Sequence, residues 1–167
     1  IRTMSLVPTG HDMEHGLSDH NRQRYARHLV LPSVGEEGQI KLLKSSVIVV
    51  GAGGLGSPAM MYLAAAGVGR IGIIDDDFVE ESNLQRQIIH STSSIGDAKA
   101  KSAAERICLL NPEIDVIPMV DRLTESNALS VIKDYDIVID GTDNFASRYL
   151  IGLSLIHISE PTRLVSI

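Results

Sequence analysis

Three glycines, Gly51, Gly53 and Gly56, follow the order G-x-G-x-x-G within the segment GAGGLG. The segment comes after the β-branched run VIVV and before SPAMMYLAAAG, which is rich in small and apolar residues. A glycine turn between a buried strand and a helix presents free N–H groups and the positive helix end to an anion. The pattern therefore predicts a phosphate-binding turn, in which Gly54 is a further position without a side chain.

Each glycine of the pattern has its own expected role. We expect Gly51 to permit the tight turn, Gly53 to let the ligand approach the backbone, and Gly56 to let helix and strand pack closely. Asp75 follows nineteen residues after Gly56, at the end of the segment GRIGIID, where a carboxylate can accept hydrogen bonds from ribose hydroxyls. The ligand is therefore expected to be a nucleotide. The sequence has no GxxxxGK[ST] motif, which excludes a P-loop enzyme and leaves NAD(H) or ATP.

Charged residues after the other strands favour ATP. Arg86, in SNLQRQ, can hold phosphate oxygens through two parallel hydrogen bonds, and Lys99 opens the predicted helix in GDAKAKSA. Asp143, after YDIVIDGT, suits Mg²⁺, although it can equally cap a following helix. Arg86 and Lys99, each taken alone, are also compatible with a solvated surface. Together with Asp143, they supply the cations and the metal ligand that a triphosphate needs more than NAD does.

The elements that must position these residues alternate along the chain. Strands are predicted at 45–51, 69–77, 113–120 and 135–144, and helices at 57–67, 97–111 and 124–135. This rhythm predicts a Rossmann-like α/β fold, with a mainly parallel sheet and helices on both of its faces. Ligands of such sheets bind at the carboxyl ends of the strands. We also expect Thr124 to cap its helix and Cys108 to lie on the buried face of the helix at 97–111.

Length and composition narrow the class of protein. The 167 residues fit one domain, and the single cysteine excludes an intrachain disulfide framework and fits a reducing compartment. The net charge of −6 argues against a nucleic-acid partner. With no apolar run of about 18 residues and no signal peptide, we expect no membrane association and a cytoplasmic location.

The first part of the chain carries little chemistry. Residues 1–20 lack periodicity and are expected to form a flexible leader, followed by a nucleotide-binding domain over 21–151. His11 and His15 have a helical metal-ligand spacing, but glycines flank the pair and no third ligand is evident, so no metal site is predicted there. The segment NRQRYARHLVLP predicts a short helix that ends before Pro32.

An ordered series of segments resembles the ThiF/MoeB-type activating enzymes: RYARHLVLP, GAGGLGSP, YLAAAGVGRIGIID, SNLQRQIIH, GDAKAKSAAERICLLNP and YDIVIDGTDNFASRYL. The resemblance runs from about Arg24 to Ile151 and is strongest to eukaryotic adenylyltransferase/sulfurtransferases that activate the molybdopterin-synthase small subunit and a ubiquitin-related modifier. It implies an adenylyltransferase. ATP and the C-terminal glycine carboxylate of a ubiquitin-like sulfur-carrier protein would give an acyl-adenylate and pyrophosphate.

The resemblance also implies roles for individual residues. Gly54 would lie against the nucleotide, Asp75 would hold the ribose, and Lys99 would neutralise the departing pyrophosphate. Asp143 would bind Mg²⁺ with Asn144 beside it, and the family's equivalent of Arg27 reaches into the partner's site, which implies a homodimer. The residues implied to line the nucleotide site further are Ser82, Asn83, Leu84, Gln85 and Arg86.

The chain departs from the family's pattern at its end. Residues 152–167, GLSLIHISEPTRLVSI, match nothing in the family at that place, and the family's reactive cysteine, CxxC zinc motifs and rhodanese domain do not occur. We therefore expect an incomplete adenylation domain, with Zn²⁺ only in a part that is absent here, and Cys108 is not expected to replace the reactive cysteine. The alternatives are an NAD-dependent oxidoreductase half-domain and a non-catalytic subunit of a heterodimeric activating enzyme.

Overall fold

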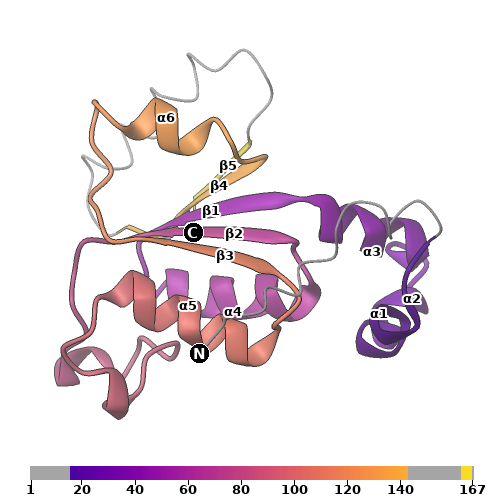
Figure 1. The fold of residues 1–167 in the computed structure, drawn as a ribbon, viewed down its shortest axis with the longest axis horizontal. Coiled ribbons are helices and arrows are strands. Elements are labelled where there is room, and N and C mark those ends of the chain that lie inside the picture. The colour runs from indigo at the N-terminus through magenta and orange to yellow at the C-terminus, as the bar shows by residue number, and fades with distance from the viewer. Residues whose placement is uncertain (1–15, 143–162, 167) are drawn as a thin grey trace, which may run out of the picture.

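A parallel five-stranded sheet runs through the computed structural model, which describes residues 16–142 and 163–166 (Figure 1). In chain order, the strands are β1 (Ser46–Val50), β2 (Arg70–Ile74), β3 (Asp115–Met119), β4 (Ile137–Asp140) and β5 (Arg163–Ser166). Their order in the sheet is β3-β2-β1-β4-β5, and every neighbouring pair is parallel. The predicted α/β fold with a parallel sheet is confirmed.

Helices cover both faces of the sheet (Figure 1). The helices α4 (Gly56–Ala66) and α5 (Lys99–Leu110) lie on one face, and α6 (Ala128–Ile132) lies on the other. Three more, α1 (Asp19–Arg24), α2 (Ala26–Leu29) and α3 (Gly35–Lys44), lie beyond the end at which β1 begins. In the described ranges, no helix combines the length and apolar character needed to cross a bilayer.

The core has two halves because successive strand residues point to opposite faces. Val47 and Val49 of β1 belong to the cluster formed with α4 and α5, whereas Ile48 and Val50 belong to the cluster formed with α6. All four side chains are at most 4% exposed. Burial on both faces explains why β1 is an uninterrupted β-branched run rather than an alternating one.

The turn between β1 and α4 depends on two glycines. Gly51 has a φ of +94°, in the left-handed region that side chains other than glycine rarely adopt. A Cβ atom on Gly56 would overlap the carbonyl oxygen of Gly51. The structure therefore agrees with the predicted roles of Gly51 in the turn and of Gly56 in close packing.

Cys108 is exposed, so its predicted burial is wrong. Each helical residue advances by about 100°, and this rotation carries Cys108 off the buried face beyond Ile107. Desolvation is the largest cause that raises the pKa of its thiol, and the carboxylates of Asp115 and Glu105 raise it further. The buried residues of α5 are Lys99, Ala100, Ser102, Ala103, Ala104 and Ile107.

The predicted capping of α6 by Thr124 is also wrong. The helix begins at Ala128 after Asn127, and the Thr124 hydroxyl is hydrogen-bonded to the Ser126 hydroxyl at 2.9 Å. The backbone carbonyl of Thr124 accepts hydrogen bonds from the N–H groups of Asn127 and Ala128, at 3.2 and 2.9 Å. A turn therefore precedes α6 and shortens it relative to the prediction.

Folded structure begins before the predicted boundary at residue 21. Leu17 is 6% exposed, and the Ser18 hydroxyl caps α1 by accepting a hydrogen bond from the Asn21 N–H at 3.1 Å. The single helix predicted next is divided into α1 and α2 at Tyr25, whose ring is buried. The histidine pair at 11 and 15 lies outside the described residues, whereas part of the segment at 152–167 forms β5 beside β4.

Replacing Gly56 by alanine should destabilise the domain, because the new methyl group would meet the Gly51 carbonyl. We expect the free energy of unfolding to fall by about 2–3 kcal/mol, measured by urea denaturation. The matched control is Gly54→Ala, whose Cβ would lie 3.5 Å from Cγ of Arg86, an ordinary contact. The control should change stability by less than about 1 kcal/mol. Equal losses in the two variants would contradict the packing role of Gly56.

Candidate nucleotide-binding site

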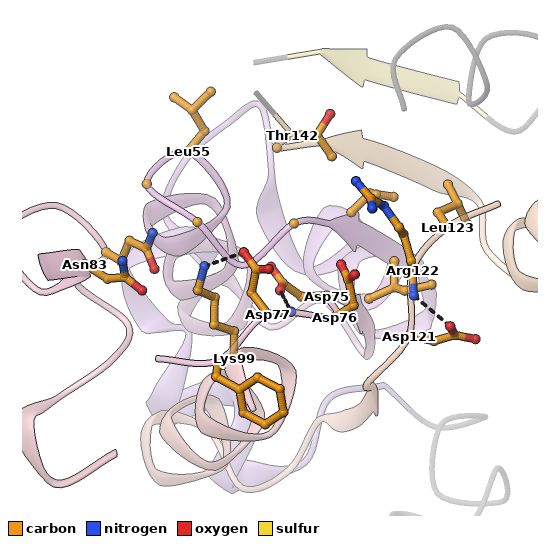
Figure 2. Close-up of a pocket in the computed structure, with 18 of the residues that line it drawn as sticks. Leu55, Asp75, Asp76, Asp77, Asn83, Lys99, Asp121, Arg122, Leu123 and Thr142 are labelled. Atoms are coloured by element: carbon orange, nitrogen blue, oxygen red, sulfur yellow. Dashed lines mark hydrogen bonds and ion pairs between the residues drawn. The ribbon is translucent and has the colours of Figure 1, made fainter. Parts of the chain in front are cut away.

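A cavity of about 930 Å³ opens at the carboxyl ends of β1, β2, β3 and β4 (Figure 2). Its lining comes from residues within the segments 50–55, 74–80, 83–87, 121–123 and 141–142, together with Lys99. These segments follow four different strands, so the parallel sheet gathers them at one edge. The cavity therefore lies where the glycine turn and the strand topology predicted a ligand.

Asp75 ties the glycine turn to the end of β2. Its Oδ2 accepts a hydrogen bond from the Ala52 N–H at 2.7 Å, and its Oδ1 accepts one from the Asp77 N–H at 2.8 Å. Burial raises the pKa of the Asp75 carboxyl, and these two hydrogen bonds oppose that rise. A carboxylate offers about four lone-pair positions, so two remain for the ribose hydroxyls that the sequence predicts.

Lys99 brings a positive charge to the cavity from the start of α5. Its Nζ donates to Oδ2 of Asp77 at 2.8 Å (Figure 2), and the side chains of Lys99 and Asp77 are 9% and 67% exposed. A cation at a helix N-terminus is unfavourable to the helix dipole. Because its partner is largely in water, the buried ammonium is only partly compensated within the protein. This placement suits an anionic ligand better than it suits helix stability.

Arg86 lies over the glycine turn. A Cβ on Gly54 would be 3.5 Å from Cγ of Arg86, and the arginine Nη1 donates to the Ser82 carbonyl at 3.3 Å. Asn83, which ends the short 3₁₀ helix η2 (Glu81–Asn83), accepts a hydrogen bond from the Glu80 N–H at 3.1 Å. In a 3₁₀ turn residues three apart share one side, and both Asn83 and Arg86 line the cavity.

The structure brings seven of the predicted site residues together around the cavity. These are Gly51, Gly53, Gly54, Asp75, Asn83, Arg86 and Lys99. Five others do not line it, namely Arg27, Gly56, Ser82, Leu84 and Gln85. The last three lie on the other sides of the turn that carries Asn83 and Arg86, so their part in binding stays a prediction. Asp143 and Asn144 lie outside the described residues, directly after Thr142, which does line the cavity.

Several cavity residues were missed from the sequence. Asp76 and Asp77 follow Asp75 directly, and the three carboxylates lie within 4.8 Å of one another. Asp121 and Arg122 follow β3, so the rule that ligands bind at strand ends could have identified them. The other missed lining residues with polar side chains are Glu80, Gln87 and Thr142.

A buried histidine supports the glycine turn from behind. His90 is 7% exposed, and its Nε2 lies 3.0 Å from the Ala52 carbonyl oxygen while its Nδ1 lies 2.9 Å from Oγ of Ser102. Since the carbonyl can only accept, Nε2 carries the proton and donates. Desolvation lowers the pKa of His90, and the charge of Lys99 lowers it further.

A parallel sheet with this glycine turn and no Walker motif defines a Rossmann-like nucleotide-binding domain. The chain belongs to the ThiF family, whose model matches residues 25–160. That membership confirms the resemblance found in the sequence.

Curated relatives show the same family relationship. The chain is 52% identical over 153 residues to the adenylyltransferase and sulfurtransferase MOCS3 of Arabidopsis thaliana, covering 92% of this chain and 33% of that protein. It is 49% identical over 141 residues to the SAMP-activating enzyme E1 of Haloferax volcanii, covering 80% of this chain and 52% of that protein. The chain thus spans about a third of the plant protein and about half of the archaeal one.

Solved structures give the same fold. The tRNA N6-threonylcarbamoyladenosine dehydratase TcdA of E. coli, in complex with ATP, aligns with a TM-score of 0.82 and 34% identity, over 89% of this chain and 60% of TcdA. E. coli MccB with AMPCPP and MccA aligns with a TM-score of 0.76 and 26% identity, over 87% of this chain and 45% of MccB.

The lowered pKa of His90 predicts a dependence of stability on pH. The neutral imidazole is favoured in the folded protein, so the unfolded chain binds the proton more readily. The free energy of unfolding should therefore be highest above about pH 6.5 and should fall as the pH decreases below it. Urea denaturation at several pH values should show a smaller fall in His90→Gln. His20→Gln, which removes a surface histidine, serves as the control, and an unchanged slope in His90→Gln would contradict the prediction.

Proposed function

We propose that this domain binds ATP and serves the adenylation of a C-terminal carboxylate on a ubiquitin-like sulfur-carrier protein. The proposal rests on one observation: Arg86, the buried Lys99 and the glycine turn line the same cavity. The ATP and AMP complexes of the structural relative TcdA support a nucleotide ligand. The names of the curated relatives, adenylyltransferases among them, support the reaction class.

The proposed reaction joins two anions. A carboxylate oxygen of the carrier protein forms a bond to the α-phosphorus of ATP while the bond from that phosphorus to the bridging oxygen of the β-phosphate breaks. Pyrophosphate leaves with the electron pair of the broken bond. The chemistry requires no side-chain nucleophile. The chain's contribution is to position the reactants and to neutralise charge, through the N–H groups of the glycine turn, Arg86 and Lys99.

The charges of the cavity fit a nucleotide that arrives with Mg²⁺. Asp75, Asp76 and Asp77 place three carboxylates within 4.8 Å of one another beside the proposed phosphate site. A bare triphosphate would be repelled there, and carboxylate oxygens are donors that Mg²⁺ accepts. We propose Asp143 as a magnesium ligand. When bound, the ion would draw charge from the phosphate oxygens.

We further propose that the domain acts in a homodimer. Arg27 is exposed on α2, which lies beyond the end of the sheet at which β1 begins, whereas the cavity lies at the opposite ends of the strands (Figure 1). Arg27 therefore cannot serve the cavity of its own chain from this position. A second copy could bring its Arg27 to the cavity, as the family resemblance implies.

Mg·ATP should raise the melting temperature of the chain, whereas NAD(H) should not, in a thermal-shift titration. Lys99→Met should weaken ATP binding by about 10-fold or more, because it removes a charged donor from the phosphate site. The matched control is Lys101→Met, since Lys101 lies exposed on the same helix outside the cavity. Stabilisation by NAD(H) alone would instead favour an oxidoreductase half-domain.

Mixing two variants of reduced activity tests the role of Arg27 in the full-length protein that carries this domain. Arg27→Ala and Lys99→Met should each reduce ATP–pyrophosphate exchange. In a mixed dimer, one of the two sites would hold both native residues, so mixing should restore part of the activity. Light scattering and tagged subunits would verify that mixed dimers form. Mixed dimers that stay inactive would contradict action across the dimer.

A further inference from the structure

The side chain of Gln87 is buried, but part of its hydrogen-bonding capacity is not used within the described residues. It lines the cavity and is 4% exposed, yet its Oε1 is enclosed with no hydrogen-bond partner in the described residues. Gln39, which is also buried, uses both ends of its carboxamide: Nε2 donates to the Ala66 carbonyl at 2.9 Å, and Oε1 lies 2.8 Å from Nδ1 of His28. An unsatisfied buried polar atom costs about 1–3 kcal/mol. Fold stability therefore does not explain a glutamine at position 87.

The side chain of Gln87 lies against the phosphate-binding turn. A Cβ on Gly53 would be 3.9 Å from Nε2 of Gln87, just as one on Gly54 would be 3.5 Å from the Arg86 side chain. Two consecutive residues thus cover two consecutive glycines. The backbone of Gln87 is held on both sides, because its N–H donates to the Asn83 carbonyl at 2.9 Å and its carbonyl accepts from the His90 N–H at 3.1 Å.

We propose that the Gln87 carboxamide is a ligand-binding group that donates, through Nε2, to a phosphate oxygen of the bound nucleotide. The inference rests on the function proposed above and adds a residue to it. A phosphate oxygen only accepts hydrogen bonds, so its partner must be Nε2, the end of the amide that lies beside Gly53. A neutral amide adds a directed hydrogen bond beside the cations Arg86 and Lys99 without adding charge.

Two substitutions at this position separate a ligand contact from a packing role. Gln87→Met keeps the length of the side chain but removes the amide, and it should weaken ATP binding by about 10-fold or more in calorimetric titration. Gln87→Glu places an anion at the phosphate site and should weaken ATP binding further. Adenosine lacks phosphates, so its weak binding, followed by ligand-observed NMR, should be the same in wild type and Gln87→Met.

Stability measurements supply the second readout. Unliganded Gln87→Met should melt at or above the wild-type temperature, because the unsatisfied oxygen is gone. The matched control, Gln39→Met, should melt lower yet keep its ATP affinity, since Gln39 makes two hydrogen bonds away from the cavity.

The outcomes distinguish this inference from the proposed function. If wild type binds no ATP, the proposed function fails. If wild type binds ATP and Gln87→Met binds it equally well, only the role of Gln87 fails. Equal weakening of ATP and adenosine would place the contact on the nucleoside and overturn the assignment to phosphate.

Discussion

The hydrogen bond from the Ala52 N–H to the Asp75 carboxylate fixes the arrangement on which the site depends. It joins the turn after β1 to the segment after β2, and the Ala52 carbonyl is held from the other side by His90. Both polar groups of one residue are thus engaged inside the protein. A bond to a charged carboxylate is among the stronger hydrogen bonds in proteins. The turn is therefore shaped before any ligand arrives, and the glycines on its outer side remain open.

Charge around this turn is arranged for function as much as for stability. Lys99 lies at the end of α5 where the helix dipole disfavours a cation, and its partner Asp77 is mostly in water. Burial raises the pKa of the Asp75 carboxyl, whereas the Lys99 charge opposes that rise. These unfavourable placements of charged groups occur together at one cavity, whereas β1 and its neighbours follow ordinary packing rules. Such a contrast between core and cavity is typical of a binding site.

Sequence patterns predicted the sheet and the turn because these depend on local periodicity and on the spacing of glycines. The strands β2 and β4, and the close packing of Gly56 against Gly51, could be predicted from these patterns alone. The sequence-based predictions were wrong where the fold decides in which direction a side chain points. A rotation of about 100° separates the exposed Cys108 from the buried Ile107. The geometry of a 3₁₀ turn decides which residues of SNLQRQ face the cavity. Whether the Gln87 side chain has a hydrogen-bond partner could be judged only from the residues around it.

Tyr25 has a consequence for the order of assembly as the chain is synthesised. Its buried hydroxyl accepts a hydrogen bond at 3.0 Å from Asn111, which also donates to the Ala64 carbonyl at 2.8 Å, and the ring fills the space beside Gly67. Eighty-six residues separate Tyr25 from Asn111. Although α1 and α2 leave the ribosome first, the hydrogen bond from Asn111 to Tyr25 can form only after α5 has emerged. Until then the Tyr25 hydroxyl lacks its Asn111 partner, so the attachment of this N-terminal segment is completed only late in synthesis.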